Sequence, residues 1–550
     1  MGNLFSDERG ISFGQQKEDE GEVVEEVVCD ENDLNDGQMK EVQVDEKPIL
    51  LVKEGGVIRA IGGKCTHYGA PLIKGTLCDG RVRCPWHGAC FNVATGDIED
   101  FPGLDSLHTF KVQVKNGKVK VRARKQALES NRKLKKIADK ETCRPEHILL
   151  IGGGPASLVC AETLRKEGYT GNITMSTNET NLPYERVKLS KAIGVDAKTI
   201  GLRKKDFYSD HNIVIRTDMT AKKLNTVLNT VTFENGEQLF YDKLLIATGV
   251  RPRVMTCKGS DLKNIVNLRS PEDGAAILKN GEGKDVVIVG ASFIGIEVAA
   301  SLGPKAKSLT IVDKGDVPFQ KSFGTQVGSA IRNLLENNLT GIKYHSRTSV
   351  KEFVGKNNKL QRIILMNGEE IPADLCIVGI GTEANTDWLA DSGVSLALNK
   401  CIRVDKQMHS NKQDVYAAGD LTVFPLFMAK NEMTNIQHWQ MAHQQGRIVA
   451  LNMLGFQVNI HSVPYFWTVI FGKSLRYAGY AVGFDDIVIR GDAMALKFVA
   501  FYTKGDEVVA VASMNYDPIV SRVADYFHAG KTVRKCTVQE SPDGWIDLND

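Results

Sequence analysis

The sequence predicts a multidomain protein with a small all-β domain near its N-terminus, an α/β core of two dinucleotide-binding folds and an α+β C-terminal domain. Two observations predict the core: residues 147–168 read as a buried strand, a glycine turn and an amphipathic helix, and residues 285–303 repeat that pattern. A third observation predicts the all-β domain, because short strands and Gly-rich turns fill the segment before the core. At 550 residues the chain is long enough for roughly three to four domains.

Changes of pattern along the chain predict the domain boundaries. The acidic N-terminal tail lacks hydrophobic periodicity and is expected to be disordered. A Lys/Arg-rich segment before the core is expected to form a solvated linker helix, with a basic membrane-facing surface as the alternative. The predicted divisions are the tail at 1–25, the all-β domain at 26–124, the basic linker at 125–145, the first dinucleotide-binding domain at 146–275 and again at 401–460, the second one at 276–400, and the C-terminal domain at 461–550.

Composition and charge exclude several classes of protein. The net charge is +2, with 42% hydrophobic and 25% charged residues, which gives no reason to expect a nucleic-acid partner. No uncharged apolar run reaches the length of a membrane span, and no secretory signal is visible. The eleven scattered cysteines are therefore expected to be reduced in an intracellular compartment. Gly2 and Ser6 fit an N-myristoylation pattern, which alone would give only weak, reversible membrane association.

The first glycine turn reads Gly152-x-Gly154-x-x-Ser157. Its first glycine permits a tight turn, and its second lets the backbone approach a pyrophosphate at a helix N-terminus, where negative charge is favoured. Ser157 replaces a third glycine but is small enough for close packing of helix on strand. This turn alone is weak evidence, so other segments of the chain have to support it.

Three other segments supply that support. A strand runs into an Ala-Thr-Gly turn, another strand ends in an acid, and residues 181–191 read NLPYERVKLSK. Together they resemble the two-dinucleotide-domain flavoprotein reductases, and the last resembles the Pro-Tyr-x-Arg…Leu-Ser-Lys segment of the apoptosis-inducing-factor and ferredoxin-reductase group. The resemblance implies that the first dinucleotide fold binds FAD. The implied FAD positions are Thr248, Gly249, Asp420, Glu179 (with Asn178 as the alternative), Arg186, Lys191, Thr220 and Trp467, the last together with Trp439.

The second glycine turn reads Gly290-x-Ser292-x-x-Gly295, and Asp313 follows Gly290 by 23 residues. An acid at the end of the second strand can bind ribose hydroxyls and repels a 2′-phosphate, which favours NADH over NADPH. A strand-end turn acid is the alternative reading of this residue.

The resemblance also implies a catalytic pair. Glu297 matches a carboxylate that lies near nicotinamide and flavin in this group, with a helix-surface role as the alternative. Lys191 is its expected companion, and Gly381 is a further expected nucleotide contact. Between Cys160 and Cys257 the chain has no cysteine, so dithiol chemistry beside the flavin is not expected.

A cysteine and a histidine stand in each of two loops of the all-β domain. Their spacing is Cys65-x-His67, sixteen residues, Cys84-x-x-His87. Two thiolates and two imidazoles could hold tetrahedral zinc, but a zinc finger would normally place its histidines on one helix. The arrangement instead resembles the Rieske domain, in which two thiolates bind one iron of a [2Fe–2S] cluster and two imidazoles bind the other. Zinc remains the alternative.

The same loops predict a cluster of low potential. High-potential Rieske proteins add one cysteine to each loop, and these form a disulfide; Ala70 and Trp86 stand at those positions, and Ala89 replaces a serine donor. Fewer donors leave the reduced cluster less stabilised, so we expect a potential in the lower half of the range of about −150 to +300 mV. His67 and His87 are expected at the cluster's solvent side.

The combination of domains resembles the Rieske-bearing members of the apoptosis-inducing-factor family. It implies an NADH-dependent flavoprotein oxidoreductase that passes electrons through FAD to a Rieske [2Fe–2S] cluster and then to an unidentified acceptor, with a pro-apoptotic, mitochondrion-associated role. Two alternatives are a redox-sensing signalling protein with little turnover and a reductase that supplies a separate oxygenase. A homodimer is left open by the sequence.

Overall fold

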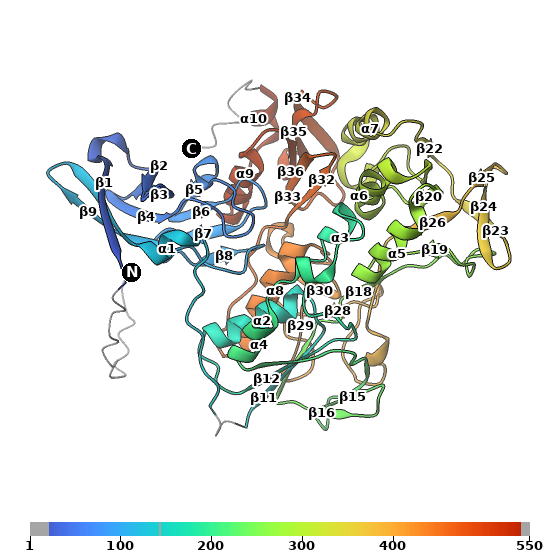
Figure 1. Cartoon of the computed structure of the whole chain (residues 1–550), viewed down its shortest axis with the longest axis horizontal. Coiled ribbons are helices and arrows are strands. Elements are labelled where there is room, and N and C mark those ends of the chain that lie inside the picture. Colours follow the sequence, from blue (N-terminus) through green and yellow to red (C-terminus); the bar gives the residue numbers. More distant parts are fainter. Residues whose placement is uncertain (1–20, 142–144, 541–550) are drawn as a thin grey trace.

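The N-terminal domain consists of two antiparallel sheets in the computed structural model, which describes residues 21–141 and 145–540. In spatial order, the larger sheet contains β1 (Val23–Asp30), β10 (Lys118–Arg124), β9 (Thr109–Lys115), β4 (Val57–Gly62), β3 (Lys47–Glu54) and β2 (Gln38–Val44). The smaller sheet contains β5 (Thr76–Cys78), β6 (Arg81–Arg83), β7 (Cys90–Asn92) and β8 (Ile98–Asp100). The domain is drawn in blue at the left of Figure 1. Gly2 lies outside the described residues.

The first dinucleotide fold surrounds a five-stranded parallel sheet. Its spatial order is β13 (Ile213–Arg216), β12 (Asn172–Ser176), β11 (His147–Ile151), β17 (Lys243–Ile246) and β29 (Val415–Ala417). The strands are nearly continuous apolar runs because helices cover the parallel sheet. Helices α2 (Pro155–Lys166) and α8 (Trp439–Met453) lie against each other, and Gly446 permits this, since a Cβ there would collide with the Ala156 carbonyl oxygen. Smaller elements complete the fold: α3 (Lys188–Lys191), α4 (Lys205–Asp210), β14 (Ala221–Asn225), β15 (Thr230–Phe233), β16 (Gln238–Phe240), β28 (Ile402–Arg403), β30 (Thr422–Leu426) and β31 (Glu432–Thr434).

The second dinucleotide fold repeats this design. Its parallel sheet has the order β19 (Ile265–Val266), β26 (Leu375–Val378), β20 (Asp285–Val289), β21 (Ser308–Val312) and β22 (Lys343–His345). Its helices are α5 (Pro271–Gly281), α6 (Phe293–Leu302) and α7 (Gln320–Asn338), and an antiparallel sheet of β23 (Val350–Lys356), β24 (Lys359–Leu365) and β25 (Glu370–Pro372) flanks it. β18 (Val250–Pro252) pairs with β27 (Thr382–Ala384) where the chain passes between the two folds.

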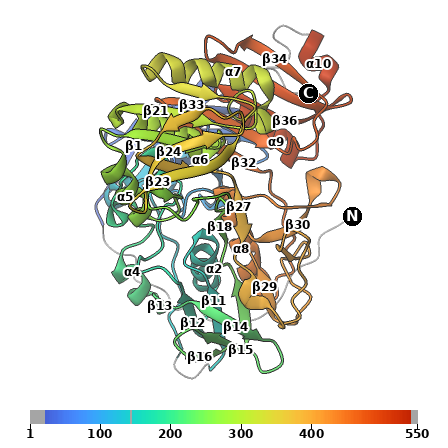
Figure 2. The same cartoon turned by 90° about the vertical axis from the view of Figure 1, so that its right-hand side faces the viewer.

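The C-terminal domain is a five-stranded antiparallel sheet with two helices. Its spatial order is β32 (Tyr465–Ile470), β33 (Lys473–Gly479), β36 (Glu507–Met514), β35 (Lys497–Lys504) and β34 (Asp486–Asp492), followed in the chain by α9 (Ile519–His528) and α10 (Lys535–Glu540). Figure 1 shows α9 beside the small sheet of the N-terminal domain, and Figure 2 shows α2 and α8 side by side in the first dinucleotide fold. The predicted fold class is confirmed. Among the described residues, no helix combines the length and apolar character that crossing a bilayer requires.

The prediction of a linker helix is wrong for most of the basic segment. Only α1 (Lys125–Glu129) is helical, and residues 130–141 run without regular helix along the outside of the molecule. The few apolar residues of the segment find little to pack against, since Leu134 is 46% exposed, and its polar groups instead bind neighbouring backbone. Asn131 Nδ2 donates to the Cys65 carbonyl at 3.0 Å, and Arg132 Nε donates to the Thr66 carbonyl at 3.0 Å. The linker therefore braces the first cysteine–histidine loop.

Buried ion pairs join the N-terminal domain to its neighbours. Arg83, only 2% exposed, lies 2.6 Å from Asp525 of α9 and 3.1 Å from Asp100 of its own domain. On another side, Arg203 of the first dinucleotide fold lies 2.7 Å from Asp105 of the N-terminal domain and 2.8 Å from Glu162 of α2. Losing one partner of such a pair would leave a buried charge uncompensated, which typically costs about 3–5 kcal/mol. These pairs therefore specify one docked orientation of the domain.

Acidification should weaken the folded state through Glu162. Burial raises the pKa of this carboxyl, but Lys166 and Arg203 outweigh that effect and lower it to about 2. Since the folded pKa lies below the unfolded one, this stabilisation is complete at neutral pH and is lost as the pH falls below about 4.5 toward 2. We expect wild-type protein to lose on the order of 3 kcal/mol through this group over that range, measured by urea unfolding at a series of pH values.

The matched variants are Glu162→Gln and Glu336→Gln, the latter at an exposed carboxylate that pairs with Arg332 on α7. Glu162→Gln should flatten the acid limb of the profile, whereas Glu336→Gln should keep it. An acid limb of wild-type steepness in Glu162→Gln would contradict the assignment.

Candidate functional site

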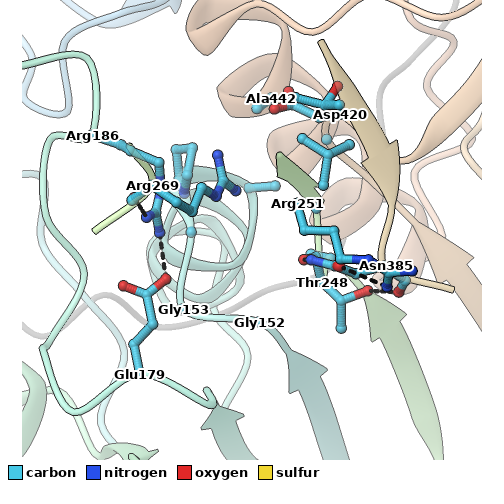
Figure 3. Close-up of a pocket in the computed structure, with 18 of the residues that line it drawn as sticks. Gly152, Gly153, Glu179, Arg186, Thr248, Arg251, Arg269, Asn385, Asp420 and Ala442 are labelled. Carbon is cyan, nitrogen blue, oxygen red and sulfur yellow. Dashed lines mark hydrogen bonds and ion pairs between the residues drawn. The ribbon is translucent and has the colours of Figure 1, made fainter. Parts of the chain in front are cut away.

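A cavity of about 1000 Å³ lies where the first dinucleotide fold, α6 and strand β32 meet. Figure 3 shows Gly152 and Gly153 at its floor, with Arg186 and Arg269 on one side and Asp420 and Ala442 on another. The cavity brings together most of the residues that the sequence assigned to FAD. Those that line it are Gly152, Gly154, Asn178, Glu179, Arg186, Lys191, Thr220, Thr248, Gly249, Glu297, Asp420, Trp439 and Trp467.

The first glycine turn has the shape that a bound pyrophosphate needs. Gly152 adopts a φ of 125°, and a Cβ there would collide with the carbonyl oxygen of Ala247. Gly154 caps the N-terminus of α2 and has open space where a Cβ would stand. Ser157 is fully buried inside α2 and does not line the cavity, which agrees with a packing role. Backbone amides and the helix N-terminus thus face the cavity, ready for an anion.

Two arginines supply positive charge beside this turn. Arg186 Nη2 lies 2.6 Å from Glu179 Oε1, the pair dashed in Figure 3, and its Nη1 donates to the Arg269 carbonyl at 2.6 Å. Burial, together with the neighbouring Arg186, lowers the pKa of Arg269 to about 10. Within residues 21–141 and 145–540, the Arg269 guanidinium forms no direct ion pair with a carboxylate, so its charge is available to a ligand. Sequence reasoning missed Arg269, because no local motif marks an arginine that follows a two-residue strand.

The predicted catalytic residues form one buried pair. Glu297, 5% exposed on α6, accepts from Lys191 Nζ at 2.9 Å and from Thr468 Oγ1 at 2.6 Å. Ser190 Oγ also donates to this carboxylate. These donors come from two distant segments of the chain, and they hold the carboxylate in the cavity wall rather than on a helix surface. The fixed charge pair can orient a ligand and keep bulk water out of this corner.

Thr248 and Gly249 connect the cavity to the second dinucleotide fold. Thr248 Oγ1 donates to the Asn385 carbonyl at 2.7 Å, and Asn385 Nδ2 donates to the Thr248 carbonyl at 3.0 Å. Gly249 adopts a φ of 63°, which suits glycine in this turn. Thr220 accepts the backbone amide of Glu234 through its carbonyl at 2.9 Å.

The glycines and the serine of the second turn lie beside the cavity, whereas Phe293 and Ile294 of the same turn line it. A Cβ at Gly290 would collide with the Gly379 carbonyl oxygen, and one at Gly295 would collide with the Gly290 carbonyl oxygen. Ser292 caps α6, and Gly381 has a φ of 99° with open space around it. This cradle fits close approach of a second dinucleotide.

Asp313 braces the second turn. Its carboxylate accepts the backbone amides of Ala291 at 3.0 Å and Gly315 at 2.7 Å. Binding of the ribose by this residue, and with it the preference for NADH, stays a prediction.

The four predicted metal ligands lie together as a sulfur pair and a nitrogen pair. Burial opposes ionisation of the Cys84 thiol, but hydrogen bonds from Cys65 and backbone amides lower its pKa, and the same pairing raises that of Cys65. The Nδ1 atoms of His67 and His87 are 3.1 Å apart, and burial with the neighbouring His67 lowers the pKa of His87. In the described part of the chain, no three His, Cys, Asp or Glu side chains surround one point as a single-ion site requires. Two sulfur and two neutral imidazole donors fit the ligand set of a Rieske [2Fe–2S] cluster.

The expectation that both histidines face solvent is wrong. His87 is 7% exposed, and its ring packs on Trp467 of β32 with centroids 4.3 Å apart; the His67 centroid lies 5.9 Å from the same tryptophan. Glu185 Oε1 lies 3.6 Å from His67 Nε2. The docked flavoprotein core covers this edge, a contact that composition and spacing could not reveal.

Three family models match the chain along most of its length. Residues 25–111 match the Rieske [2Fe-2S] domain, residues 146–446 match the pyridine nucleotide-disulphide oxidoreductases, and residues 465–542 match the reductase C-terminal domain. Apoptosis-inducing factor 3 of Mus musculus is 47% identical over 523 residues, which is 94% of this chain and 86% of that protein. The ferredoxin–NAD(+) reductase component of the biphenyl dioxygenase system of Paraburkholderia xenovorans is 30% identical, over 63% of this chain and 84% of its own.

Solved structures resemble the core as well. The covalent putidaredoxin reductase–putidaredoxin complex contains a chain with a TM-score of 0.69 and 25% identity, which covers 73% of this chain and 98% of that one. The fold and the site thus define an FAD-dependent pyridine nucleotide oxidoreductase with a Rieske domain. The chain belongs to the apoptosis-inducing factor 3 family within the pyridine nucleotide-disulphide oxidoreductases.

Removing the Arg269 charge should weaken FAD binding. A hydrogen bond to a charged group contributes about 1.5–3 kcal/mol, so Arg269→Gln should raise the dissociation constant for FAD about 10- to 100-fold. Fluorescence titration of flavin into flavin-free protein measures this. Arg332→Gln, at a half-buried arginine of α7 that does not line the cavity, is the matched control and should bind FAD like wild type. If the two variants bound FAD with equal affinity, Arg269 would not be part of the FAD site.

Proposed function

We propose that this chain oxidises NADH and passes the electrons within one molecule from its flavin cavity to its Rieske domain. When bound, FAD supplies the conversion of a two-electron hydride transfer into the single-electron steps that a [2Fe–2S] cluster requires. The observation that carries the proposal is Trp467, which lines the cavity and packs on His87 with ring centroids 4.3 Å apart. One side chain therefore contacts both sites.

Cavity residues give each cofactor a defined place. Gly152, Arg186 and Arg269 would hold the flavin pyrophosphate by backbone amides and positive charge. The second glycine turn, Gly290 to Gly295, would hold the nicotinamide dinucleotide. The Glu297–Lys191 pair would set the orientation of the reacting rings and exclude water from the junction, since its atoms are held by 2.6–2.9 Å hydrogen bonds. Cys65, His67, Cys84 and His87 would ligate the cluster.

The final acceptor is proposed to be a separate protein. Several relatives carry names of ferredoxin– or rubredoxin–NAD(+) reductases, including the benzene 1,2-dioxygenase subunit of Pseudomonas putida. In this chain, Tyr68 stacks on His67 with centroids 3.9 Å apart and is 41% exposed, so it offers a route from the ligand loop to the surface. Reoxidation of the reduced chain by added ferredoxin, followed by absorbance, tests for such an acceptor; a reduced state unchanged by ferredoxin would favour a redox sensor with little turnover.

A pro-apoptotic, mitochondrion-associated role is proposed from the names of the mouse and human relatives. If the role depends on electron transfer, Cys84→Ser should lose cell-killing activity together with its cluster, whereas a surface variant such as Glu336→Gln should keep both. Viability of cells that express each variant at equal level provides the measurement. Equal killing by Cys84→Ser would separate the role from redox chemistry.

Removing the Trp467 ring should slow electron transfer from the flavin cavity to the cluster. Trp467→Leu removes the ring that joins the cavity to His87, so we expect cluster reduction to slow at least about tenfold relative to the bleaching of the flavin by NADH in the same variant. Stopped-flow absorbance that follows the flavin and cluster bands together measures both rates. The control is Trp86→Leu, which changes a tryptophan of the ligand loop that does not line the cavity.

If cluster reduction follows flavin reduction with the same delay in Trp467→Leu and wild type, electrons do not pass through Trp467. A cluster that stays oxidised in wild type would contradict electron transfer within one molecule. Very slow flavin bleaching in wild type would instead support the sensor.

A further inference from the structure

The C-terminal domain and the first dinucleotide fold both supply groups to the ligand loops of the Rieske domain. Ser521 Oγ of α9 donates to the Cys84 carbonyl at 3.0 Å, and Arg476 Nε of β33 donates to the Trp86 carbonyl at 2.9 Å. The domain's own loops have Ala89 where a serine donor would stand. Part of the environment of the cluster is therefore built by other domains and exists only when the Rieske domain is docked.

Glu185 is the most direct of these groups. It belongs to the segment before α3, which also carries Arg186 into the flavin cavity, and it is 8% exposed. Its Oε1 lies 3.6 Å from His67 Nε2 and accepts the Tyr68 hydroxyl, while its Oε2 lies 3.0 Å from Lys188 Nζ. A carboxylate at the outer nitrogen of a ligand histidine fixes which nitrogen faces the metal, and it tunes the metal.

The charge of Glu185 persists despite burial. Its carboxylate accepts the Tyr68 hydroxyl and lies 3.0 Å from the Lys188 ammonium group, and both contacts favour the ionised form. Glu185 thus places a negative charge beside the imidazole pair. No described residue of the Rieske domain has a carboxylate in ion-pair contact with His67, so this charge comes from the neighbouring domain alone.

We propose that Glu185 is a positioning residue for the cluster: it orients His67 with Nδ1 toward the iron and lowers the reduction potential of the docked cluster. Adding an electron next to a fixed anion is unfavourable, so the anion favours the oxidised state. Lys188 partly neutralises Glu185 and acts in the opposite direction. Removing the charge of Glu185 and removing the charge of Lys188 should therefore shift the reduction potential in opposite directions, which a purely structural role would not produce.

The test is a redox titration of the full chain, with its cluster and flavin bound, using dithionite and mediator dyes. In Glu185→Gln, the ratio of reduced to oxidised cluster at a fixed ambient potential should rise about tenfold, which is about 59 mV for a one-electron couple. In Lys188→Gln, the ratio should fall. The electron paramagnetic resonance spectrum of the reduced cluster should also shift in Glu185→Gln, because the orientation of His67 is no longer fixed.

The matched control is Glu25→Gln, an exposed carboxylate on β1 that pairs with Lys120 and lies outside the ligand loops. It should leave the midpoint potential and the spectrum unchanged. An unchanged or lower reduction potential in Glu185→Gln would overturn the proposal, and so would potential shifts of the same sign in Glu185→Gln and Lys188→Gln. If Glu185→Gln lost its cluster, Lys188→Gln, a change at a partly exposed residue, would still show whether the reduction potential shifts in the expected direction.

This inference rests on the docked arrangement in the proposed function but not on electron flow from NADH. Dithionite reduces the cluster directly, so a chain that NADH failed to reduce would still show the opposite shifts. Failure of the Trp467 test and failure of the Glu185 test are therefore distinguishable.

Discussion

The packing of the Rieske ligand loops on β32 is the contact on which the rest of the structure depends. It brings His87 against Trp467, and Trp467 is part of the wall of the flavin cavity. Because one aromatic side chain belongs to both sites, the docking of the domains sets how far the flavin cavity lies from the cysteine–histidine loops. The glycine turns, the arginines and the ligand loops each make a local site, but only this contact joins them.

Charged and polar contacts also hold the docked arrangement. Arg83 with Asp525, Arg203 with Asp105, and Glu185 with Tyr68 and His67 lie on different sides of the Rieske domain. Buried charges add little net stability compared with apolar packing, but a misplaced partner leaves one of them unpaired. The contacts therefore select one orientation against others, which is what transfer between two fixed cofactors requires.

Sequence reasoning predicted what local pattern encodes. The turns at Gly152 and Gly290 follow buried strands and precede helices, and the cysteine–histidine spacing lies within one domain, so all were visible along the chain. Arg269 and the contacts of Glu185 were not visible. Arg269 enters the cavity after a two-residue strand, and Glu185 meets Tyr68 across 117 positions. Such residues are selected by tertiary proximity, for which a single sequence contains no periodic signal.

The linker shows why a lysine- and arginine-rich composition alone led to the wrong prediction of a helix. Residues 125–141 are rich in lysine and arginine, which favour helix in isolation. A helix gains most of its stability in a protein by packing an apolar face, and in this segment Leu134 stays 46% exposed. Its side chains instead bind the carbonyls of Cys65 and Thr66, and its backbone amides at Ala138 and Glu141 donate to the first dinucleotide fold. Fastened at both ends, the linker keeps the effective concentration of the Rieske domain high at its docking surface. Polar contacts that would be weak between separate molecules are then sufficient to hold the cluster in place.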